Sequence, residues 1–340
     1  MVLVGGNPMK EIKTDRKACD VTVATIVYIP ELSGYWEESL ETLKLCLASI
    51  IHNTGPDFDL MVFDNGSCQE VCAYLLDLHA KGLIQYLILS DGNVGKPAAM
   101  NVLFGAAPGK YVAFTDSDVL FRPGWLEASI AVFEAFPRVG MVSGRPWRPI
   151  RDITFEQVAK NRDVVKKVDG VEVQEGDLIP REYLEEHARS LGSHPIPELK
   201  PEGQDLKITR NGITVYGFGS HFQFVTTADV IKEAGPLAVA DVGLWKSVRS
   251  WDERICELAY LRLALDGPYV KHLGNTLEDE NVEELESAAG LQGSVQRRHH
   301  GHGRSLLTRI LEIIILVPFF KRCMKRLHRH MYEALSVRKR

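Results

Sequence analysis

Two aspartates one residue apart, Asp116 and Asp118, carry the clearest chemical potential in this sequence. They follow the apolar run 111–114 in the segment KYVAFTDSDVLF, so negative charge stands at the end of an expected buried strand. Carboxylate oxygens are preferred ligands of Mg²⁺ and Mn²⁺, and such a cation neutralises charge that develops on a departing diphosphate. The structural alternative is a turn or helix start, which Thr, Ser and Asp also favour.

The segments that must position this pair alternate between strand-like and helical patterns. VTVATIVYI (21–29) is rich in β-branched residues, and a helical apolar spacing follows over 37–54. A second strand, FDLMVFDNGS, ends at Asp64. The alternation predicts an α/β fold with a Rossmann-like, mainly parallel central sheet flanked by helices. Because ligands of such sheets bind beyond the carboxyl ends of the strands, we expect Asp64 to lie near Asp116 and Asp118.

The alternation of strand-like and helical segments ends near residue 150, which suggests that further structural segments follow. A charged, helix-prone stretch is followed by a second core-like pattern, and then by a polar stretch with Gly and His. We predict one domain over 1–275, made of a first half (1–150), a helical insertion (151–210) and a second half (211–275), then a linker (276–305) and a helical tail (306–340).

The tail combines an apolar stretch with concentrated positive charge. Between Arg297 and Arg340 there are twelve Lys and Arg against two Glu, although the whole chain has a net charge of -5. LLTRILEIIILVPFF is shorter than a bilayer-spanning helix and contains Arg309 and Glu312. The pattern favours either an amphipathic helix on an anionic membrane surface or a helix that contacts another subunit or the catalytic domain. No module that would indicate nucleic-acid binding accompanies the charge.

Cysteine usage and the N-terminus bear on the compartment. The six cysteines include no C-x-x-C pair, and the first residues lack the apolar core of a signal peptide. We therefore expect a reduced, cytoplasmic protein, peripheral at the inner face of the membrane if the tail binds lipid.

A set of five segments resembles the family 2 glycosyltransferases of the GT-A fold. The segments VATIVYIPE, VFDNGS, NVGKPAAMN, FTDSDV and WDERICELAYLRLALDG occur in the family's order and approximate spacing over residues 21–275. The resemblance implies an inverting enzyme that uses Mn²⁺ or Mg²⁺. It makes 1–275 the catalytic domain, with 1–150 as the half that binds the nucleotide sugar and the metal and 211–275 as the acceptor-side half. Its donor would be a UDP-, GDP- or dTDP-sugar, and its acceptor a hydroxyl group, including that of a lipid-linked glycan.

The resemblance also implies roles for individual residues. Gly95 would let the backbone approach the nucleotide, and Lys96 would touch a phosphate unless it is a solvated surface lysine. The implied metal ligands are Asp118, Asp116 and His272, although a lone histidine is more often structural. The implied nucleotide-binding residues are Thr25, Val27, Pro30, Glu31, Asp64, Asn93, Gly95, Lys96, Asp116 and Ser117.

Catalysis by inversion requires a base for the acceptor hydroxyl. The resemblance implies Asp252, with Glu253 as its rival, although both also suit the start of a helix. His221, Trp245 and Trp251 would border the acceptor, although a tryptophan is more often part of the core.

Two other functions remain open at this point. A sugar-phosphate nucleotidyltransferase shares the nucleotide-binding architecture, but its Gly- and Arg-containing loop should follow the first strand, where this chain has YIPELSGYWEE. A non-catalytic scaffold could keep the fold and use the basic tail for assembly. The retained aspartates argue against the scaffold.

Overall fold

The structure is a computed structural model that describes residues 16–55, 57–148, 152–191, 204–239, 244–277 and 282–290. The chain divides into two units, Met1–Ser294 and Val295–Arg340. The predicted tail (306–340) lies outside the described residues. None of the helices in the described ranges has the length and apolar content to span a bilayer.

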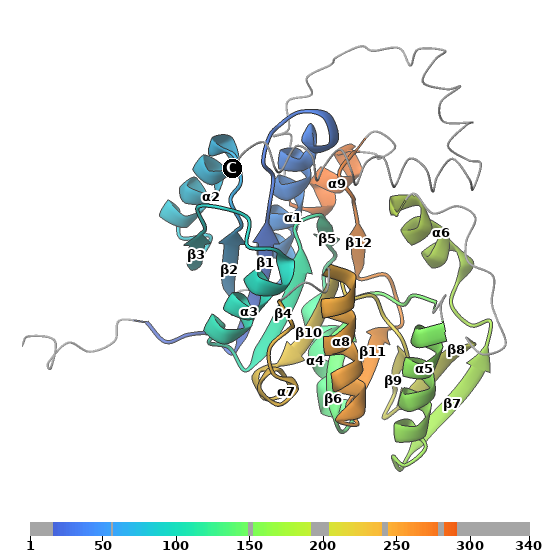
Figure 1. The fold of residues 1–340 in the computed structure, drawn as a ribbon. Coiled ribbons are helices and arrows are strands. Elements are labelled where there is room, and N and C mark those ends of the chain that lie inside the picture. Colours follow the sequence, from blue (N-terminus) through green and yellow to red (C-terminus); the bar gives the residue numbers. More distant parts are fainter. Residues whose placement is uncertain are drawn as a thin grey trace, which may run out of the picture. The chain divides into compact units, whose positions relative to one another are not determined.

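Most strands belong to one sheet, in the order β3-β2-β1-β4-β10-β6-β11-β9-β8-β7. Strands β1 to β4, β6 and β11 run in one direction, and β10 lies antiparallel between β4 and β6. The α/β class and the largely parallel sheet flanked by helices are therefore confirmed (Figure 1). The strands are β1 (Val21–Val27), β2 (Asp59–Asp64), β3 (Tyr86–Leu89), β4 (Tyr111–Asp116), β5 (Val119–Phe121), β6 (Val139–Ser143), β7 (Val171–Gly176), β8 (Asp205–Arg210), β9 (Ile213–Tyr216), β10 (Gln223–Thr227), β11 (Leu261–Leu265) and β12 (Val270–His272).

The helices of the described residues lie mainly on the two faces of this sheet. They are the 3₁₀ helix η2 (Gly34–Trp36) and the α-helices α1 (Ser39–Asn53), α2 (Gln69–Ala80), α3 (Lys96–Ala106), α4 (Trp125–Ala135), α5 (Asp152–Val165), α6 (Arg181–Ser190), α7 (Ala228–Ala234), α8 (Leu244–Glu257) and α9 (Val282–Ala288). Figure 1 shows α3 and α8 on the near face of the sheet, with α1 behind it.

The first strand is buried on both faces, because helices cover both sides of the sheet. Val23 and Val27 pack with α1 and α2, whereas Ala24 and Ile26 pack with α3 and α8. Successive side chains of a strand point to opposite faces, so one strand supplies two cores. This double burial explains why VTVATIV is an almost continuous apolar and β-branched run.

The predicted insertion, 151–210, contains strands as well as helices. Strands β7 and β8 extend the sheet as antiparallel partners, and Ile208 of β8 is fully buried with Val215 of β9. Helix α6 lies beside them in sequence and packs through Leu184 and Ala188 against Trp147. The insertion therefore completes one end of the sheet.

A separate two-stranded ladder, β5 with β12, stands next to the end of β4. It pairs Val119 with His272, and the backbone N–H of Leu273 donates to the carbonyl of Asp118 over 2.7 Å. This ladder brings a late segment of the chain to the Asp116–Asp118 turn. The chain then continues into α9, inside the predicted linker (276–305), where Leu285 packs with Leu45 of α1.

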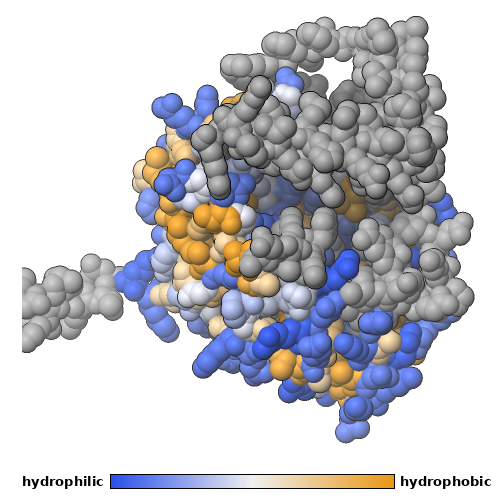
Figure 2. All heavy atoms as spheres, viewed as in Figure 1, coloured by the Kyte–Doolittle hydropathy of each residue, from blue (hydrophilic) through white to orange (hydrophobic). Residues whose placement is uncertain are grey.

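Apolar side chains also reach the surface. Figure 2 shows a group of hydrophobic residues over the region of β3 and α3, where Leu89, Val94 and Val102 are exposed. Of these, Val94 also borders the cavity described next.

Candidate functional site

A cavity of about 690 Å³ lies at the carboxyl ends of β1 and β4. This is the edge at which open α/β sheets bind ligands. It is lined by Ile26, Tyr28, Tyr35, Trp36, Asn65, Asn93, Val94, Gly95, Lys96, Pro97, Asp116, Ser117, Asp118, Ala238, Val239 and Ser247. The predicted residues Asn93, Gly95, Lys96, Asp116, Ser117 and Asp118 are thus brought together in one wall.

The register of β1 decides which of its residues reach the cavity. Ile26 pairs with Asp116 of β4, and both line the cavity. Thr25 and Val27 are fully buried and do not line it. Val27 points to the α1 and α2 side, as alternation requires of a neighbour of Ile26. Thr25 and Val27, which the resemblance implies as nucleotide-binding residues, therefore do not line the cavity. Ile26 and Tyr28 line it instead.

The same register places Asp64 away from the cavity. It pairs with Val27, is almost completely buried, and accepts hydrogen bonds from the backbone N–H of Ser67 (3.2 Å) and from the thiol of Cys72 (3.1 Å). Burial and the hydrogen bond to this carboxylate raise the pKa of Cys72 to about 11. Asp64 thus stabilises the turn into α2, while the next residue, Asn65, lines the cavity.

Asn65 holds the loop that leads into α3. Its Oδ1 accepts from the backbone N–H of Val94 (2.8 Å), and its Nδ2 donates to Oδ1 of Asn93 (3.0 Å). Asn93 in turn accepts from the N–H of Gly95 (2.8 Å), which has a φ of 84° that only glycine adopts at low cost. The loop is therefore preorganised, with the N-terminus of α3 at the cavity.

The two aspartates of the turn have different partners. Asp116 forms an ion pair with Lys96, which begins α3. Asp118 lies with its Oδ2 3.3 Å from Nε2 of His272. Burial alone would raise the pKa of Asp118 and lower that of His272, but their hydrogen bond and opposite charges reverse both shifts. Asp118 and His272 thus form a charged pair at the cavity wall in the absence of a ligand.

The donor set suits a hard divalent cation. Oδ1 of Asp118 is buried and has no hydrogen-bond partner among the described residues. No group of three or more His, Cys, Asp and Glu side chains gathers for a metal ion in the described part of the chain. Mg²⁺ and Mn²⁺ sites that act on nucleotides need only one or two protein ligands, because phosphates and water complete the shell. Asp118 and His272 fit that requirement, with Asp116 close by in sequence.

The predicted base, Asp252, is buried in α8 and does not line the cavity. Its Oδ2 accepts from Nη2 of Arg262 (2.9 Å) and lies 3.1 Å from Nδ1 of His221. Although burial opposes ionisation, Arg262 and the hydrogen bond from His221 hold the pKa of Asp252 below its usual value. Its neighbour Glu253 is half-buried and is also absent from the cavity lining.

The remaining predicted residues lie elsewhere. Trp251 is buried, stacks with Phe104 at 5.4 Å between ring centroids and donates its Nε1–H to the carbonyl of Gly235 (3.1 Å), so it belongs to the core. The side chain of Trp245 lies outside the described residues. Pro30 and Glu31 are exposed beyond β1 and do not line the cavity.

Three aromatic residues form a lip of the cavity that the sequence prediction missed. Trp36 meets Tyr28 at 5.8 Å and Tyr35 at 4.9 Å between ring centroids, edge to face in both cases. The aromatic content of YIPELSGYWEE directly after the first strand was the available signal. These rings, Tyr28, Tyr35 and Trp36, are called the aromatic lip below.

The aromatic lip is tied to the segment that follows β12. The side-chain amide of Asn275 donates to the carbonyl of Tyr35 (2.8 Å). Glu38 accepts from the hydroxyl of Thr276 and from the backbone N–H of Leu277, both at 2.7 Å. The residues after His272 therefore also support the aromatic lip of the cavity.

Two aspartates and a neighbouring histidine thus stand beside a cavity at the carboxyl edge of an open α/β sheet, where sheets of this kind bind their ligands. Residues 35–174 match the family described as Glycosyl transferase family 2. The match includes the carboxylates and the loop into α3, and it ends before His272 and Asp252.

Curated relatives agree with the family. The chain is 27% identical over 100 residues to an uncharacterised glycosyltransferase of Nostoc sp., covering 29% of this chain and 31% of that protein. It is 26% identical over 112 residues to one of Haemophilus influenzae, covering 33% of this chain and 32% of that protein. The chain thus matches about a third of the length of these relatives.

Solved structures show a looser likeness. A mannosyltransferase from Pyrobaculum calidifontis, in complex with GDP-Man and Mn²⁺, has a TM-score of 0.42 and 17% identity, covering 73% of this chain and 55% of that one. GalNAc-T7, with UDP, GalNAc and Mn²⁺, has a TM-score of 0.46 and 12% identity, covering 76% and 44%.

Proposed function

We propose that this protein is a metal-dependent glycosyltransferase that moves a sugar from a nucleoside diphosphate sugar to a hydroxyl acceptor, with inversion. The observation that carries the proposal is the buried, unpartnered Oδ1 of Asp118 beside His272 at the cavity wall. A carboxylate oxygen in that state is ready for a cation, and the cavity next to it has the size of a ligand site.

Residues of the cavity suit the parts of a nucleotide. The aromatic lip offers ring faces and edges for a nucleobase. The N-terminus of α3 presents the positive end of a helix dipole, and Lys96 can exchange its contact with Asp116 for a phosphate. The nucleobase would thus lie toward Tyr35 and Trp36, and the diphosphate toward Lys96.

Asp118 and His272 would hold Mn²⁺ or Mg²⁺, with Asp116 in support. A bound cation of this kind neutralises the negative charge on a diphosphate leaving group. The chain's own part is to fix the ligands: the β5–β12 ladder pairs His272 with Val119, next to Asp118, and so holds the two side chains in contact. Such preorganisation reduces the cost of assembling the site.

As the general base that takes the proton from the acceptor hydroxyl, we propose Asp252 acting together with His221. The carboxylate is buried and ion-paired, whereas the His221 side chain is 29% exposed and touches it. An acceptor hydroxyl can therefore reach the imidazole, and the carboxylate orients the ring and stabilises its charged form. His221 also precedes Phe222, whose carbonyl accepts from the N–H of Asp116, so it lies next to the turn in the sheet.

The acceptor and the location remain proposals from the sequence. A lipid-linked acceptor fits the basic tail, which we propose binds an anionic membrane at the cytoplasmic face or contacts a second subunit. Co-flotation of the full chain with vesicles containing anionic lipid tests the first, and sedimentation tests the second. Neither outcome bears on the cavity.

The function is tested first by binding. Calorimetric titration of UDP, GDP and dTDP with and without Mn²⁺ should reveal one nucleotide whose affinity depends on the metal. Asp118→Ala should remove that dependence, whereas Asp77→Ala, which removes an exposed carboxylate on α2, should not. A chain that binds none of the three nucleotides would be a scaffold, and the proposal would fail.

A donor screen then tests the reaction. We expect hydrolysis or transfer to release a nucleoside diphosphate from one class of nucleotide sugar. Formation of a nucleotide sugar from a nucleoside triphosphate with release of pyrophosphate would instead identify a nucleotidyltransferase.

A further inference from the structure

Asn101, inside helix α3, binds the backbone of a residue 136 positions later in the chain. Its Nδ2 donates to the carbonyl of Leu237 (2.9 Å), and its Oδ1 accepts from the N–H of the same residue (2.8 Å). A carboxamide carries a donor and an acceptor side by side, so it satisfies both backbone groups of Leu237 as a neighbouring strand would. Asparagine is a poorer helix former than alanine, so its benefit lies in this long-range contact. Residues 235–239, which include Leu237, are called the wall segment below.

The wall segment is held at two further points. The Nε1–H of Trp251 in α8 donates to the carbonyl of Gly235 (3.1 Å), and the hydroxyl of Ser247 in α8 donates to the carbonyl of Ala238. Leu237 itself is buried among side chains of α3 and α8. The wall segment is thus fixed between two helices that lie on the same face of the sheet (Figure 1).

The wall segment also reaches the cavity. Ala238 and Val239 line it, beside Ser247 of α8. The other lining residues of the described chain all lie between 26 and 118, so these three are the contribution of the second half of the domain. Ala238 and Val239 are exposed, so a ligand in the cavity can contact them.

The proposed reaction fixes where the sugar lies in this cavity. The diphosphate lies toward Lys96, and the general base, Asp252, is in α8. The carbon that is transferred must lie between the leaving phosphate and the acceptor hydroxyl that the base activates. The wall segment precedes α8 in the chain and lines the cavity beside a residue of that helix. It therefore stands on the side toward which the sugar points.

We propose that Asn101 is a positioning residue for the sugar of the donor: it sets Ala238 and Val239 against that sugar. The inference rests on the proposed function and names the part of the chain that meets the transferred group. Lys96 begins the same helix, so α3 carries both the phosphate contact and the residue that holds the wall segment. Contacts placed on one helix keep their spacing better than contacts placed on loops.

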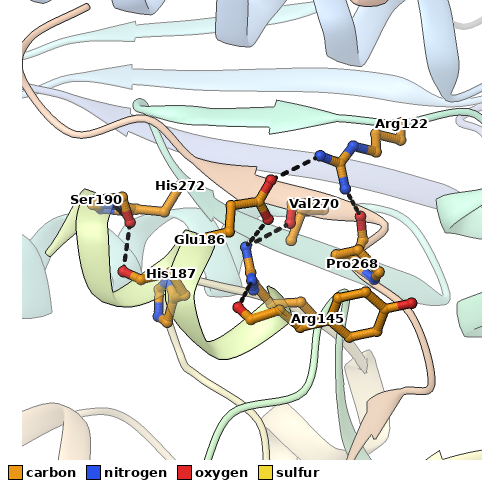
Figure 3. Close-up of polar contacts among 9 residues, drawn as sticks. Arg122, Arg145, Glu186, His187, Ser190, Pro268, Val270 and His272 are labelled. Atoms are coloured by element: carbon orange, nitrogen blue, oxygen red, sulfur yellow. Dashed lines mark hydrogen bonds and ion pairs between the residues drawn. The ribbon is translucent and has the colours of Figure 1, made fainter. Parts of the chain in front are cut away.

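The corner formed by Asp118 and His272 is anchored by other contacts. Glu186 of α6 accepts from Nη2 of Arg122 (3.0 Å) and from Nη1 of Arg145 (2.9 Å), as Figure 3 shows. Arg145 is fully buried and also donates to a backbone carbonyl of β12 (3.4 Å). These contacts do not include the wall segment. Release of the wall segment should therefore change the affinity for Mn²⁺ alone by less than about twofold.

The first test reads the wall segment itself. Hydrogen exchange of the full chain without ligand, followed by mass spectrometry, should show a protected amide at Leu237, because that N–H donates to Asn101. In Asn101→Ala the peptide that contains Leu237 should exchange at least about tenfold faster, whereas peptides of β12 should not change. Asn101→Asp should behave in the same way, since a carboxylate cannot donate to the carbonyl of Leu237. Unchanged exchange in both variants would refute the role of Asn101.

The second test compares each nucleoside diphosphate with its sugar derivative. The probes are UDP with UDP-glucose, GDP with GDP-mannose, and dTDP with dTDP-glucose, titrated by calorimetry in the presence of Mn²⁺. For the pair that the chain binds, Asn101→Ala should weaken the nucleotide sugar about tenfold and the nucleoside diphosphate by less than about twofold. The turnover number at saturating donor should fall by about a hundredfold. An equal loss of affinity for both members of the pair would overturn the proposal, because a general loss of structure gives that result.

Asn53→Ala is the matched control. The amide of Asn53, at the end of α1, donates to the backbone carbonyls of Phe121 and Ala288, both at 2.8 Å, and Asn53 does not line the cavity. This variant should have a lower melting temperature, because it loses two hydrogen bonds of the same kind. The ratio of the affinities for nucleotide sugar and nucleoside diphosphate should stay unchanged.

Val239→Trp examines the wall segment directly. Val239 is 58% exposed, so the larger side chain does not have to enter the core. It should weaken the binding of the nucleotide sugar more than that of the nucleoside diphosphate, because it narrows the space next to the sugar. An unchanged ratio of the two affinities would show that the wall segment does not meet the sugar.

The outcomes separate this inference from the proposed function. If UDP, GDP and dTDP all fail to bind the unsubstituted chain, the proposed function fails, and this use of the wall segment fails with it. If one of them binds but Asn101→Ala and Val239→Trp leave the ratio of affinities unchanged, the role of Asn101 is refuted and the proposed function stands. If the melting temperature shows that Asn101→Ala does not fold, Asn101→Asp, which has nearly the same size, takes its place in both tests.

Discussion

Asp252 and Arg262 form an ion pair inside the protein, with Oδ2 of the aspartate 2.9 Å from Nη2 of the arginine and both side chains almost fully buried. The pair joins α8, which contributes Ser247 to the cavity lining, to strand β11 of the sheet. A charge in such a place needs its partner far more than a surface charge does.

Asp252→Asn should therefore destabilise the fold, because it removes the counter-charge of a buried guanidinium. We expect a loss of about 3 kcal/mol in the free energy of unfolding, measured by urea denaturation with tryptophan fluorescence. Joint replacement, Asp252→Leu with Arg262→Met, should recover much of that loss. Glu253→Gln, a half-buried neighbour, serves as the control, and an equal loss there would contradict the assignment.

The proposed base gives a prediction in catalysis. His221→Asn should lower the turnover number by about a hundredfold or more, with little change in nucleotide affinity, because His221 lies outside the cavity lining. The competing carboxylate that the family resemblance implies is Glu253, the next residue in α8. If Glu253→Gln abolishes transfer while His221→Asn retains it, the Asp252–Arg262 pair is structural and the base is Glu253.

The register of β1 predicts opposite results for two adjacent substitutions. Ile26→Phe projects a larger ring into the cavity and should weaken nucleotide binding at least about tenfold. Thr25→Val should leave binding unchanged and cost less than about 1 kcal/mol, because the buried Thr25 hydroxyl has no hydrogen-bond partner among the described residues. Calorimetry and urea unfolding of both variants check this. Weaker binding in Thr25→Val would restore the role that the sequence resemblance implies for Thr25.

The free energy of unfolding should fall in acid, because the buried His187 resists protonation in the folded state. Burial, aided by the charges of Arg145 and His272, lowers the pKa of His187 to about 2, against about 6.5 in an unfolded chain. The unfolded state therefore binds the proton more tightly, and stability rises with pH between about 2 and 6.5. At pH 5 the titration of this histidine should lower the free energy of unfolding by about 2 kcal/mol relative to pH 7.

His187→Phe isolates this effect, since it keeps an aromatic ring beside Trp147 (4.6 Å between centroids) and removes the titration. Urea unfolding of both proteins at pH 7.5, 6 and 5 should give curves of stability that diverge below pH 6.5. Parallel curves would mean that the histidine is protonated inside the fold.

Local patterns in the sequence predict the first strand, the first helix and the Asp116–Asp118 turn, but they also predict Asp64 beside that turn, whereas Asp64 contacts Cys72 of α2 and does not line the cavity. Strand β1 falls inside the predicted 21–29 and helix α1 inside 37–54. The end of β4 at Asp116 is visible as a pattern, whereas His272 is implied only by the family resemblance, and the pairing of β12 with β5 that brings it to Asp118 has no signal in the sequence. The sequence predicts the insertion, 151–210, as helical, because the charged residues of β7, which is the edge strand of the sheet, hide its strand pattern.

Two features could not be predicted from the sequence: which side chains of β1 point to the cavity, and which residues contact the buried carboxylates. Both faces of β1 are buried, so the sequence shows no alternation that would tell Ile26 from Thr25. The partner of Asp252 is Arg262, on the following strand, and ion pairing across the core leaves no periodic signal. Asp64 and Asn65 are adjacent acidic and amide residues, and only the pairing of Asp64 with Val27 separates them.

The stretch that follows β12 supports the cavity from two sides. It begins at His272, beside the carboxylate, and within five residues it reaches Glu38 and the carbonyl of Tyr35 under the aromatic lip. Under the proposed function, contacts to the nucleobase and to the metal would both depend on this one short piece of backbone. Exchanging the loop to change the donor would then alter ion selectivity in the same step, and the two traits would have to be selected together.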